Sequence, residues 1–360
     1  MIIGITGTKR SGKSVLAKAL EKKGFVYSSL SDRVREEAAK RGLQTYTIRD
    51  LQDIGNELRT RDGTGILAKR TLDVVAGKEN VVVEGIRNPG EVEVLRNAGQ
   101  DFYLIAVDAP QRTRFQRMVE AAKPEDPADW EGFLEMDARD MGGGEVDSGQ
   151  QVAKCMEKAD YLFWKDYSTP KDAEAEFLSG KKGFLNLFER FGEKKRRPSF
   201  DEVYMHEAST WSSRTTCLRR KTGAVITLRN AGVSQGYNGS PRGMENCNEI
   251  GECLRIREGI PSGQRLEMCN AVHAEANALL NALSSGSPVE GGTLYSTTYP
   301  CSLCAGLIIN ARIARIVYDN QYTDPNGIRI LEKAEARGVI KVQRFEGVKP
   351  KSFDRFFDTV

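Results

Sequence analysis

A histidine, a glutamate and two cysteines in the second half of the chain have the types and spacing for metal-assisted chemistry. His273-Ala274-Glu275 precedes Pro300-Cys301-Ser302-Leu303-Cys304. One imidazole and two thiolates make three zinc ligands, which leaves the fourth position of a tetrahedral site open to water. Zinc lowers the pKa of such a water to about 7. Glu275 would lie near the metal without binding it, where it can carry protons.

The elements expected around these residues explain their spacing. Pro300 suits the first turn of a helix, where its missing N–H costs nothing. Cys301 and Cys304 are then three apart on that helix and share one face. His273 opens another helix, 274–283, whose buried side is predicted to carry Ala278, Leu279 and Leu283.

Two simpler interpretations compete with this one. C-x-x-C alone also fits a redox pair or half of a structural zinc knuckle, and a lone histidine is usually a core residue. The chain has only two histidines, and one of them stands in H-x-E upstream of P-C-x-x-C. That combined pattern is the signature of zinc nucleobase deaminases, so catalytic zinc is favoured.

The first half carries a phosphate-binding pattern. Residues Gly7-Thr8-Lys9-Arg10-Ser11-Gly12-Lys13-Ser14 fit G-x-x-x-x-G-K-[ST], after a strand-like segment and before a helical one. Backbone N–H groups of such a loop surround phosphate oxygens. Lys13 would reach the β/γ-phosphates of ATP or GTP, and Ser14 would bind Mg²⁺. A glycine-rich turn without a ligand would not explain the lysine and the serine.

Composition indicates two ordinary globular domains. The 360 residues exceed one average domain, and a net charge of +3 implies no strong general attraction to nucleic acid. No apolar run reaches membrane-spanning length, and the N-terminus has no signal peptide pattern. The seven cysteines, six of them in the second half, are therefore interpreted as reduced cytoplasmic thiols.

The first domain is predicted over 1–192, with strands alternating with helices. That order predicts a P-loop NTPase-type parallel sheet with helices on both faces. The predicted strands are Ile2–Thr6, Val81–Glu84, Phe102–Val107 and Tyr161–Phe163, and the predicted helices are 12–23, 31–41, 50–59, 64–76, 90–97 and 110–121. A helical stretch, 182–191, leads into a basic linker at 193–199. This run could bind phosphate, but a solvated linker is favoured.

The second domain is predicted over 200–348, followed by an aromatic tail, 349–360, which packs on a domain or a neighbouring subunit. Its elements predict an α/β/α sandwich. They are helices 200–219, 274–283 and 327–337, the helix at Cys301, and strands 223–228, 232–237, 293–298, 315–319 and 339–345.

Other residues of the first half fit a kinase. Glu84 ends a strand near the predicted metal, and Asp32 stands where small-molecule kinases often hold an acceptor-binding acid. Arg112, Arg114 and Arg117 could form a set of lid arginines or face solvent. With the P-loop, Val83–Arg87 and Val107–Pro110, this half resembles the dephospho-coenzyme A kinase and nucleoside-monophosphate kinase group.

The second half resembles the deoxycytidylate deaminase family over about residues 200–345. The resemblance is carried by Gly236-Tyr237-Asn238-Gly239-Ser240-Pro241, Ser213–Cys217, His273–Ala278 and the P-C-x-x-C segment. Transfer-RNA adenosine deaminases share the zinc pattern but are not expected to share the Gly-Tyr-Asn-Gly-x-Pro segment. The resemblance implies that Asn238 bonds the nucleotide sugar; otherwise the segment is a strand end that turns.

A second metal is predicted at Cys217, Cys247, Cys253 and Cys269. Some deoxycytidylate deaminases carry a closed second zinc site at matching places. Four thiolates would constrain the loop 238–272, which is long for a compact domain. Inert buried thiols are the alternative.

The expected reaction is zinc-dependent hydrolysis of dCMP, dCTP or both to the deoxyuridine nucleotide and ammonia. A P-loop domain joined to such a deaminase resembles bacterial anti-phage deaminases, which deplete deoxycytidine nucleotides. That resemblance implies a nucleotide effector at the P-loop, a homo-oligomer, and a regulatory RNA or protein partner. The alternatives are a bifunctional nucleotide kinase and deaminase, a nucleic-acid editing enzyme, and a nucleotide-binding switch with a vestigial zinc site.

Overall fold

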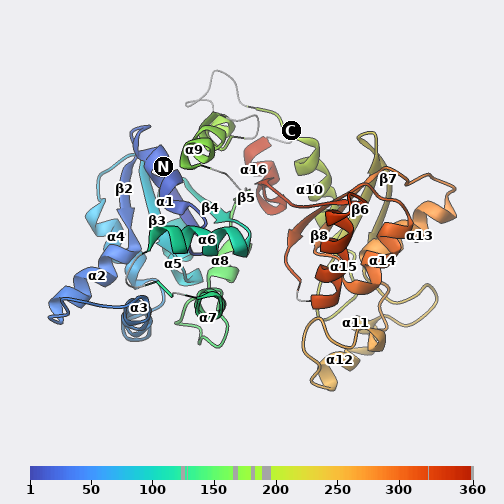
Figure 1. The fold of residues 1–360 in the computed structure, drawn as a ribbon, viewed down its shortest axis with the longest axis horizontal. Helices are drawn as coiled ribbons and strands as arrows, with labels where there is room; N and C mark the ends of the chain where they lie inside the picture. Colours follow the sequence, from blue (N-terminus) through green and yellow to red (C-terminus); the bar gives the residue numbers. More distant parts are fainter. Residues whose placement is uncertain are drawn as a thin grey trace. The chain divides into compact units, whose positions relative to one another are not determined.

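The structure is a computed structural model that describes residues 1–122, 126–127, 129–164, 169–179, 183–188, 196–322 and 324–357. The chain forms two compact units (Figure 1). Unit 1 comprises Met1–Arg196 and Gly347–Ser352, and unit 2 comprises Arg197–Glu346 and Phe353–Val360. Within the described ranges, no helix is both long and apolar enough to span a membrane.

Unit 1 is built on a six-stranded sheet in the order β11-β5-β4-β1-β3-β2. Its strands are β1 (Ile2–Gly7), β2 (Val26–Ser29), β3 (Val81–Ile86), β4 (Phe102–Asp108), β5 (Tyr161–Trp164) and β11 (Gly347–Val348). Strands β1 to β5 are parallel, and β1 and β3 are buried along their whole length. Burial on both faces explains their continuous apolar runs.

Helices cover both faces of this sheet, as the sequence predicted. They are α1 (Lys13–Glu21), α2 (Leu30–Lys40), α3 (Ile48–Asp62), α4 (Ile66–Val74), α5 (Pro89–Arg96), α6 (Gln111–Ala121), α7 (Trp130–Asp140), α8 (Val152–Glu157) and α9 (Pro170–Ser179). Side chains of α2, α3, α4, α5 and α8 form one core with alternate strand residues such as Val81 and Val83. Helix α1 packs with α9 and contacts the strands beside it. The sequence missed β2, α7, α8 and α9.

The end of the chain returns to unit 1, which differs from the predicted boundary at 348. Gly347 and Val348 pair antiparallel with β5 and so extend the edge of the parallel sheet. Ser352 donates a hydrogen bond to Asp160 of the same unit. The rest of the predicted tail forms α16 (Phe353–Phe357) in unit 2, where Phe353 stacks on His206. Residues 358–360 lie outside the described chain.

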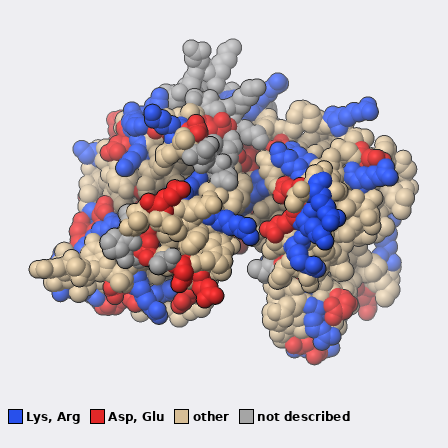
Figure 2. All heavy atoms as spheres, in the orientation of Figure 1, with Lys and Arg blue, Asp and Glu red and all other residues tan. Residues whose placement is uncertain are grey.

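The predicted linker and the helix before it are described only in part. Leu185–Leu187 form a short 3₁₀ helix, while residues 180–182 and 189–195 lie outside the described chain. Lysine and arginine are interspersed with aspartate and glutamate on the face shown in Figure 2. This mixture agrees with the small net charge of +3.

Unit 2 is an α/β/α sandwich, as predicted, on a five-stranded sheet in the order β10-β9-β8-β6-β7. Its strands are β6 (Gly223–Leu228), β7 (Ala231–Tyr237), β8 (Thr293–Thr298), β9 (Arg315–Asn320) and β10 (Lys341–Arg344). Strand β6 runs antiparallel to both β7 and β8, whereas β8, β9 and β10 are parallel.

The helices of unit 2 divide between the two faces of the sheet. Helix α10 (Phe200–Ser212) packs on one face, and α13 (Ala274–Ser284), α14 (Ser302–Asn310) and α15 (Pro325–Ala336) cover the other (Figure 1). Helix α10 begins with a capping box between Ser199 and Glu202. It ends at Ser212, before the predicted end at residue 219. The segment that follows is held by hydrogen bonds from Thr215 and Thr222 to Asn238, the residue just after β7. The long loop 238–272 contains short helices that the sequence did not predict: α11 (Cys247–Ile250), α12 (Leu254–Arg257) and the 3₁₀ helix Leu266–Met268.

Candidate active site

Helix α13 places His273 and Glu275 at its N-terminal end. His273 is the N-cap residue, and Glu275 lies in the first turn. The helix lies very close to β7, because a Cβ on Gly236 would come within 2.3 Å of the Ala274 carbonyl oxygen. Asn277 donates a hydrogen bond to the Tyr237 carbonyl oxygen and joins the two elements again. These contacts give Gly236 and Asn277 of the sequence motifs a structural role.

The buried side of α13 agrees with the prediction in part, because Ala278 is buried and Leu279 packs against the core. Ala274, Ala278 and Ala282 are buried, whereas Leu283 is 76% exposed, so its assignment to the core was wrong. Small side chains face the sheet because the backbone of α13 approaches β7 so closely.

Helix α14 places the two cysteines. It begins at Ser302, so Cys301 is its N-cap residue and Pro300 precedes the helix instead of lying in its first turn. The carboxylate of Asp324, at the start of α15, accepts a hydrogen bond of 2.7 Å from the Ser302 N–H. Asp324 thereby fixes the end of α14 that carries Cys301 and Cys304.

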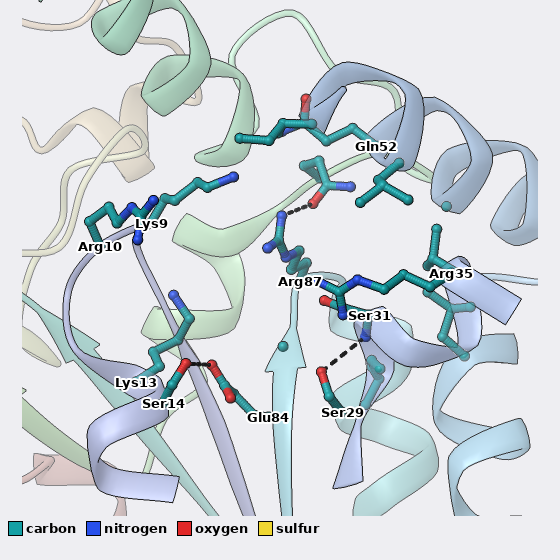
Figure 3. Close-up of a pocket in the computed structure, with 18 of the residues that line it drawn as sticks. Lys9, Arg10, Lys13, Ser14, Ser29, Ser31, Arg35, Gln52, Glu84 and Arg87 are labelled. Carbon is teal, nitrogen blue, oxygen red and sulfur yellow. Dashed lines mark hydrogen bonds between the residues drawn. The ribbon is translucent and has the colours of Figure 1, made fainter. Parts of the chain in front are cut away.

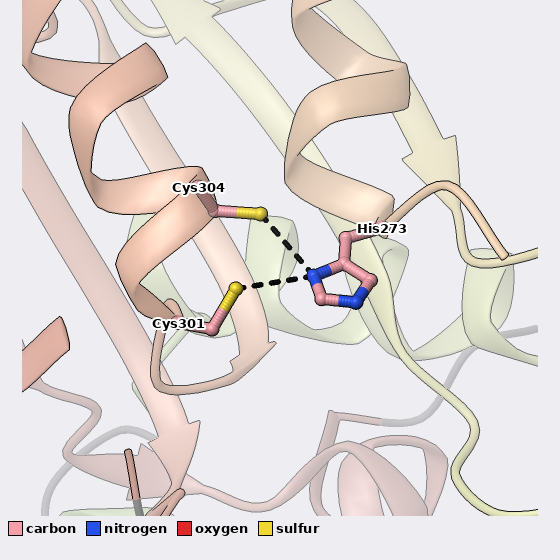
Figure 4. Close-up of side chains that lie close together, drawn as sticks. All are labelled: His273, Cys301 and Cys304. Carbon is pink, nitrogen blue, oxygen red and sulfur yellow. Dashed lines mark hydrogen bonds between the residues drawn. The ribbon is translucent and has the colours of Figure 1, made fainter. Parts of the chain in front are cut away.

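The three predicted ligands meet at one point (Figure 4). Nδ1 of His273 lies 3.2 Å from Sγ of Cys301 and 3.5 Å from Sγ of Cys304. All three ligand atoms lie within 4.8 Å of one another, and both cysteines are buried. Within the described residues, this is the single group of three or more histidine, cysteine or acidic side chains gathered so tightly.

The electrostatics of this group fit a divalent cation. Hydrogen bonds to Cys269 and Cys301 raise the pKa of His273 to about 11. The hydrogen bond with Cys304, together with His273, lowers the pKa of Cys301 to about 4. The site therefore favours positive charge beside a thiolate. Imidazole and thiolate are ligands that zinc prefers.

Glu275 lies beside the ligands and is held on both carboxylate oxygens. The Ser296 hydroxyl, from β8, donates to Oε1 at 3.0 Å, and Sγ of Cys304 donates to Oε2 at 3.6 Å. Burial raises the pKa of Glu275 above its ordinary value. A raised pKa makes the carboxyl group a better proton acceptor, as a group that carries protons requires. Ser296 was not identified from the sequence.

A pocket of about 70 Å³ opens onto His273, Glu275 and Cys301 and has arginines in its wall. Arg219, Arg220 and Arg255 line it, and none of them was identified from the sequence. Nη1 of Arg219 and Nε of Arg255 are buried, and neither has a hydrogen-bond partner among the described residues. The run Arg219-Arg220-Lys221 just after Cys217 was the one signal in the sequence.

Asn238 also lines this pocket, but its side chain is bonded within the protein. Its Oδ1 accepts hydrogen bonds from the Thr222 N–H and the Thr215 hydroxyl, both at 2.8 Å. Its Nδ2 donates to the Arg220 carbonyl oxygen. Asn238 therefore holds the segment that carries Arg219 and Arg220.

The other four cysteines of unit 2 lie near one another but not as a tight group. Cys217, Cys253 and Cys269 line the same pocket as His273. Burial and the charges of those three thiols raise the pKa of Cys247. The second zinc site stays a prediction. All seven cysteines fall within the described residues, and all are free thiols.

The P-loop of unit 1 has the backbone that the motif requires. It connects β1 to α1, and Gly12 adopts φ 100°, which side chains rarely allow. Lys13 Nζ donates to the carbonyl oxygens of Gly7 and Thr8, at 2.9 and 2.5 Å. The Ser14 hydroxyl donates to Oε1 of Glu84 at 2.8 Å. A hydroxyl and a carboxylate oxygen therefore stand together at the predicted Mg²⁺ position, and both are ligands that Mg²⁺ prefers.

The loop borders a cavity of about 550 Å³ with a surplus of cationic side chains (Figure 3). Burial and then Arg87 lower the pKa of Lys9 to about 7 and that of Lys13 to about 8. Crowded, buried cations of this kind are stabilised by a bound polyanion.

The candidate kinase residues do not gather at one site in the structure. Asp32 pairs with Arg35 at 2.9 Å and is not among the described residues that line the cavity. Arg112 is exposed, and Arg114 is buried in a two-bond pair with Asp137, at 2.5 and 2.8 Å. Of the three arginines, Arg117 lines the cavity.

Each half matches a known family. The cytidine and deoxycytidylate deaminase zinc-binding region matches residues 198–320, and an AAA domain matches residues 3–138. The second half is 38% identical over 141 residues to deoxycytidylate deaminase of Schizosaccharomyces pombe, a match that covers 38% of this chain and 42% of that protein. The chain thus spans less than half the length of that relative.

The first half is 33% identical over 177 residues to a UPF0200 protein of Pyrococcus abyssi, covering 48% of this chain and 90% of that protein. Among solved structures, dCMP deaminase from the cyanophage S-TIM5 with dCMP and dUMP is 27% identical, covering 41% of this chain and 98% of that one, with a TM-score of 0.34. On the sequence matches, the chain belongs to the UPF0200 family over its P-loop half, and its other half is a homologue of the deoxycytidylate deaminases with their zinc-binding region.

Proposed function

We propose that unit 2 removes the amino group of deoxycytidine nucleotides by hydrolysis. The substrate is dCMP, dCTP or both, and the products are the deoxyuridine nucleotide and ammonia. The observation that carries the proposal is the meeting of His273, Cys301 and Cys304 beside the buried carboxyl group of Glu275. The deaminase relatives are named for their action on deoxycytidylate, which supports this substrate class.

His273, Cys301 and Cys304 would hold the zinc ion. When bound, zinc acts as a Lewis acid and makes water nucleophilic at neutral pH. Glu275 takes a proton from the attacking water and delivers it to the pyrimidine ring nitrogen. It then carries a second proton to the departing amino group. The oxygen of water thereby replaces the amino group at C4, and ammonia leaves. Ser296 holds the carboxyl group so that one oxygen stays directed at the reacting atoms.

We propose that Arg219 and Arg255, each with one buried guanidinium nitrogen that lacks a hydrogen-bond partner within the described part of the chain, bind the phosphate of the substrate. A buried charged donor without a partner costs about 1–3 kcal/mol or more. Nη1 of Arg219 and Nε of Arg255 both carry this cost, and Arg220 lies over the Tyr322 ring at 4.9 Å beside them. A phosphate would satisfy these donors with charge-assisted hydrogen bonds. Asn238 would position this arginine segment and offer its remaining Nδ2 hydrogen to the sugar.

Unit 1 is proposed to bind the phosphates of ATP or GTP, with Mg²⁺ held by Ser14 and Glu84. Its surplus of cations beside the P-loop supports this role. We further propose that the bound nucleotide regulates deamination in a homo-oligomer and that the protein depletes deoxycytidine nucleotides during infection. The small net charge of +3 and the intermixed charges on the face shown in Figure 2 give the alternative, nucleic-acid editing, no support.

The proposal is tested by assaying ammonia release from dCMP, dCTP, CMP and CTP, with and without ATP or GTP. The wild-type protein should deaminate a deoxycytidine nucleotide, and Glu275→Ala should keep its zinc and lose turnover by at least about a thousandfold. A Glu275→Ala variant that retains turnover would contradict the mechanism. Glu290→Ala, an exposed carboxylate paired with Arg312, is the matched control.

A further inference from the structure

The pocket that opens onto the predicted zinc ligands is much smaller than a nucleotide. Its volume is about 70 Å³, whereas pockets that hold small-molecule ligands measure about 300–1,000 Å³. A water molecule takes up about 30 Å³ in the liquid, so the pocket has room for roughly two waters. Side chains of its wall must therefore move before a nucleotide reaches His273 and Glu275.

The inner part of this wall is held in place. Asn238 is buried, and it is bonded to the Thr222 N–H and to the Arg220 carbonyl oxygen. Tyr299 is also buried, and its ring packs edge-on against Tyr318 with 4.7 Å between the ring centroids. Closely packed side chains of this kind have no space to swing aside. The movement must therefore come from the solvent side of the pocket.

Two side chains of the wall meet on that side. Arg220 is exposed and Tyr322 is half-buried, and both line the pocket. The guanidinium carbon of Arg220 lies 4.9 Å from the centroid of the Tyr322 ring, which is a cation–π contact. At an exposed site such a contact changes an equilibrium constant by a factor of roughly two to five. The contact is thus favourable but easily broken.

The backbone behind each of these two side chains is fixed. The carbonyl oxygen of Arg220 accepts the hydrogen bond from Asn238 at 2.8 Å. The carbonyl oxygen of Tyr322 accepts a hydrogen bond from the Asp324 N–H at 3.1 Å, and the Asp324 side chain holds the Ser302 N–H at the start of α14. The contact therefore parts by rotation of two side chains, without movement of a loop. Such rotations take picoseconds to nanoseconds for exposed residues.

A phosphate group is a better partner for Arg220 than the tyrosine ring. Arg219 and Arg255 line the same pocket, so a phosphate bound there lies close to Arg220 as well. A hydrogen bond to a charged group changes an equilibrium constant by a factor of roughly ten to a hundred, well above the factor for the ring contact. An anionic ligand therefore draws Arg220 away from Tyr322, whereas an uncharged ligand offers no such exchange.

We propose that Arg220 and Tyr322 form a gate to the zinc ligands and that the phosphate of the substrate opens it. This inference rests on the proposed function for the identity of the ligand, a deoxycytidine nucleotide. While the guanidinium group lies over the ring, the pair narrows the pocket. When the guanidinium group turns to the phosphate, the ring is released and the pyrimidine enters. The gate thus discriminates against nucleosides before any contact with the zinc site.

The first test measures deamination of dCMP and deoxycytidine by the zinc-loaded full chain. Tyr322→Leu removes the ring and Arg220→Gln removes the charge, so each variant leaves the gate open more often. The kcat/KM for deoxycytidine should rise roughly two- to fivefold in both variants. Loss of packing alone would lower it instead. Tyr322→Phe keeps an aromatic ring and should restore the low value of the wild type.

The matched control is Arg229→Gln, which removes an exposed arginine in the turn between β6 and β7, away from the pocket. It should leave kcat/KM for both substrates unchanged. An active enzyme in which neither Tyr322→Leu nor Arg220→Gln raises kcat/KM for deoxycytidine would overturn the gate.

A second measurement does not depend on turnover. Phenanthroline is an uncharged zinc chelator, so it must pass the gate without the help of a phosphate. Zinc loss to phenanthroline is followed by absorbance, and the kinetic phase that is missing in His273→Ala belongs to the zinc behind the gate. This phase should be roughly two- to fivefold faster in Tyr322→Leu and Arg220→Gln than in the wild type, Tyr322→Phe and Arg229→Gln.

The chelator separates failure of the gate from failure of the proposed function. Zinc loss at the wild-type rate in both Tyr322→Leu and Arg220→Gln would overturn the gate, whether or not the chain deaminates any nucleotide. Faster zinc loss in a chain without deaminase activity would contradict the proposed function and support the gate.

Discussion

The hydroxyl of Ser296 and the carboxyl group of Glu275 form a buried hydrogen bond of 3.0 Å that joins β8 to α13. Ser296 is fully buried, and Glu275 is nearly so. Thr298 N–H donates to the same hydroxyl at 3.3 Å, which orients the hydroxyl proton toward the carboxyl group. The group proposed to carry protons is therefore fixed by the sheet and not only by its own helix.

Removing this hydroxyl should slow catalysis without removing zinc. Ser296→Ala deletes a buried hydrogen bond to a group that is charged during the reaction, worth about 1.5–3 kcal/mol. We expect kcat to fall roughly 10- to 100-fold with little change in KM. Parallel measurement of zinc content by atomic emission distinguishes this loss from unfolding. Ser284→Ala, at the exposed end of α13, is the control; equal activity of the two variants would exclude the role of Ser296.

Arg219 should select nucleotides over nucleosides. Arg219→Gln removes the buried donor proposed to meet phosphate, so kcat/KM for dCMP should fall about 10- to 100-fold. Deoxycytidine has no phosphate, and its kcat/KM should stay within about twofold. The measurement is the ratio of the two specificity constants in each variant. Arg312→Gln, a surface arginine with 73% of its side chain exposed, should leave that ratio unchanged. Equal losses for both substrates would show that Arg219 only maintains the fold.

The ligand set could be predicted because its geometry is local. His273 and Glu275 share one helix end, and Cys301 and Cys304 share another, so spacing alone brings each pair together. The P-loop could be predicted for the same reason, since its residues are consecutive. The strands β1, β3 and β4 were also recognisable, because burial on both faces produces unbroken apolar runs.

Features set by distant contacts could not be predicted. Helical periodicity placed Leu283 in the core, but that side chain is exposed, and α13 approaches β7 through the small residues Ala274 and Ala278. Arg219 and Arg255 are 36 positions apart, and only the fold of the 238–272 loop brings both to one pocket. The pairing of Gly347 with β5 likewise joins residues that are far apart in the sequence.

Metal content tests the second cysteine set. If Cys217, Cys247, Cys253 and Cys269 bind zinc, the wild-type protein should hold about two zinc ions per chain and Cys247→Ser about one. Loss of the site should also lower thermal stability, because the 238–272 loop would lose its constraint. Cys155→Ser replaces another buried thiol, in unit 1, and should not change zinc content. One zinc per chain in both the wild type and Cys247→Ser would refute the second site.

Phosphate binding at the P-loop should weaken as pH rises. In the free protein, burial and Arg87 lower the pKa of Lys9 to about 7 and that of Lys13 to about 8, so both lose charge between pH 7 and 9. A bound triphosphate favours the charged lysines, and binding in this range must therefore take up protons. The affinity for a non-hydrolysable ATP analogue should fall by up to about tenfold per pH unit for each lysine that titrates.

The stability of the free protein should change in the opposite direction. Both lysines have a folded-state pKa below the unfolded value of about 10.4, so the unfolded chain binds more protons and the free energy of unfolding rises from pH 7 toward pH 10.

Calorimetric titrations with the ATP analogue at pH 7.5, 8.5 and 9, in buffers of different ionisation enthalpy, measure the proton uptake on binding directly. Lys9→Met should reduce it, whereas Lys22→Met, which alters an exposed pair with Glu174, should not. An affinity that is constant over this range, with no proton uptake, would mean that these lysines stay charged in the free protein and that the P-loop is ready for its anion at every pH tested.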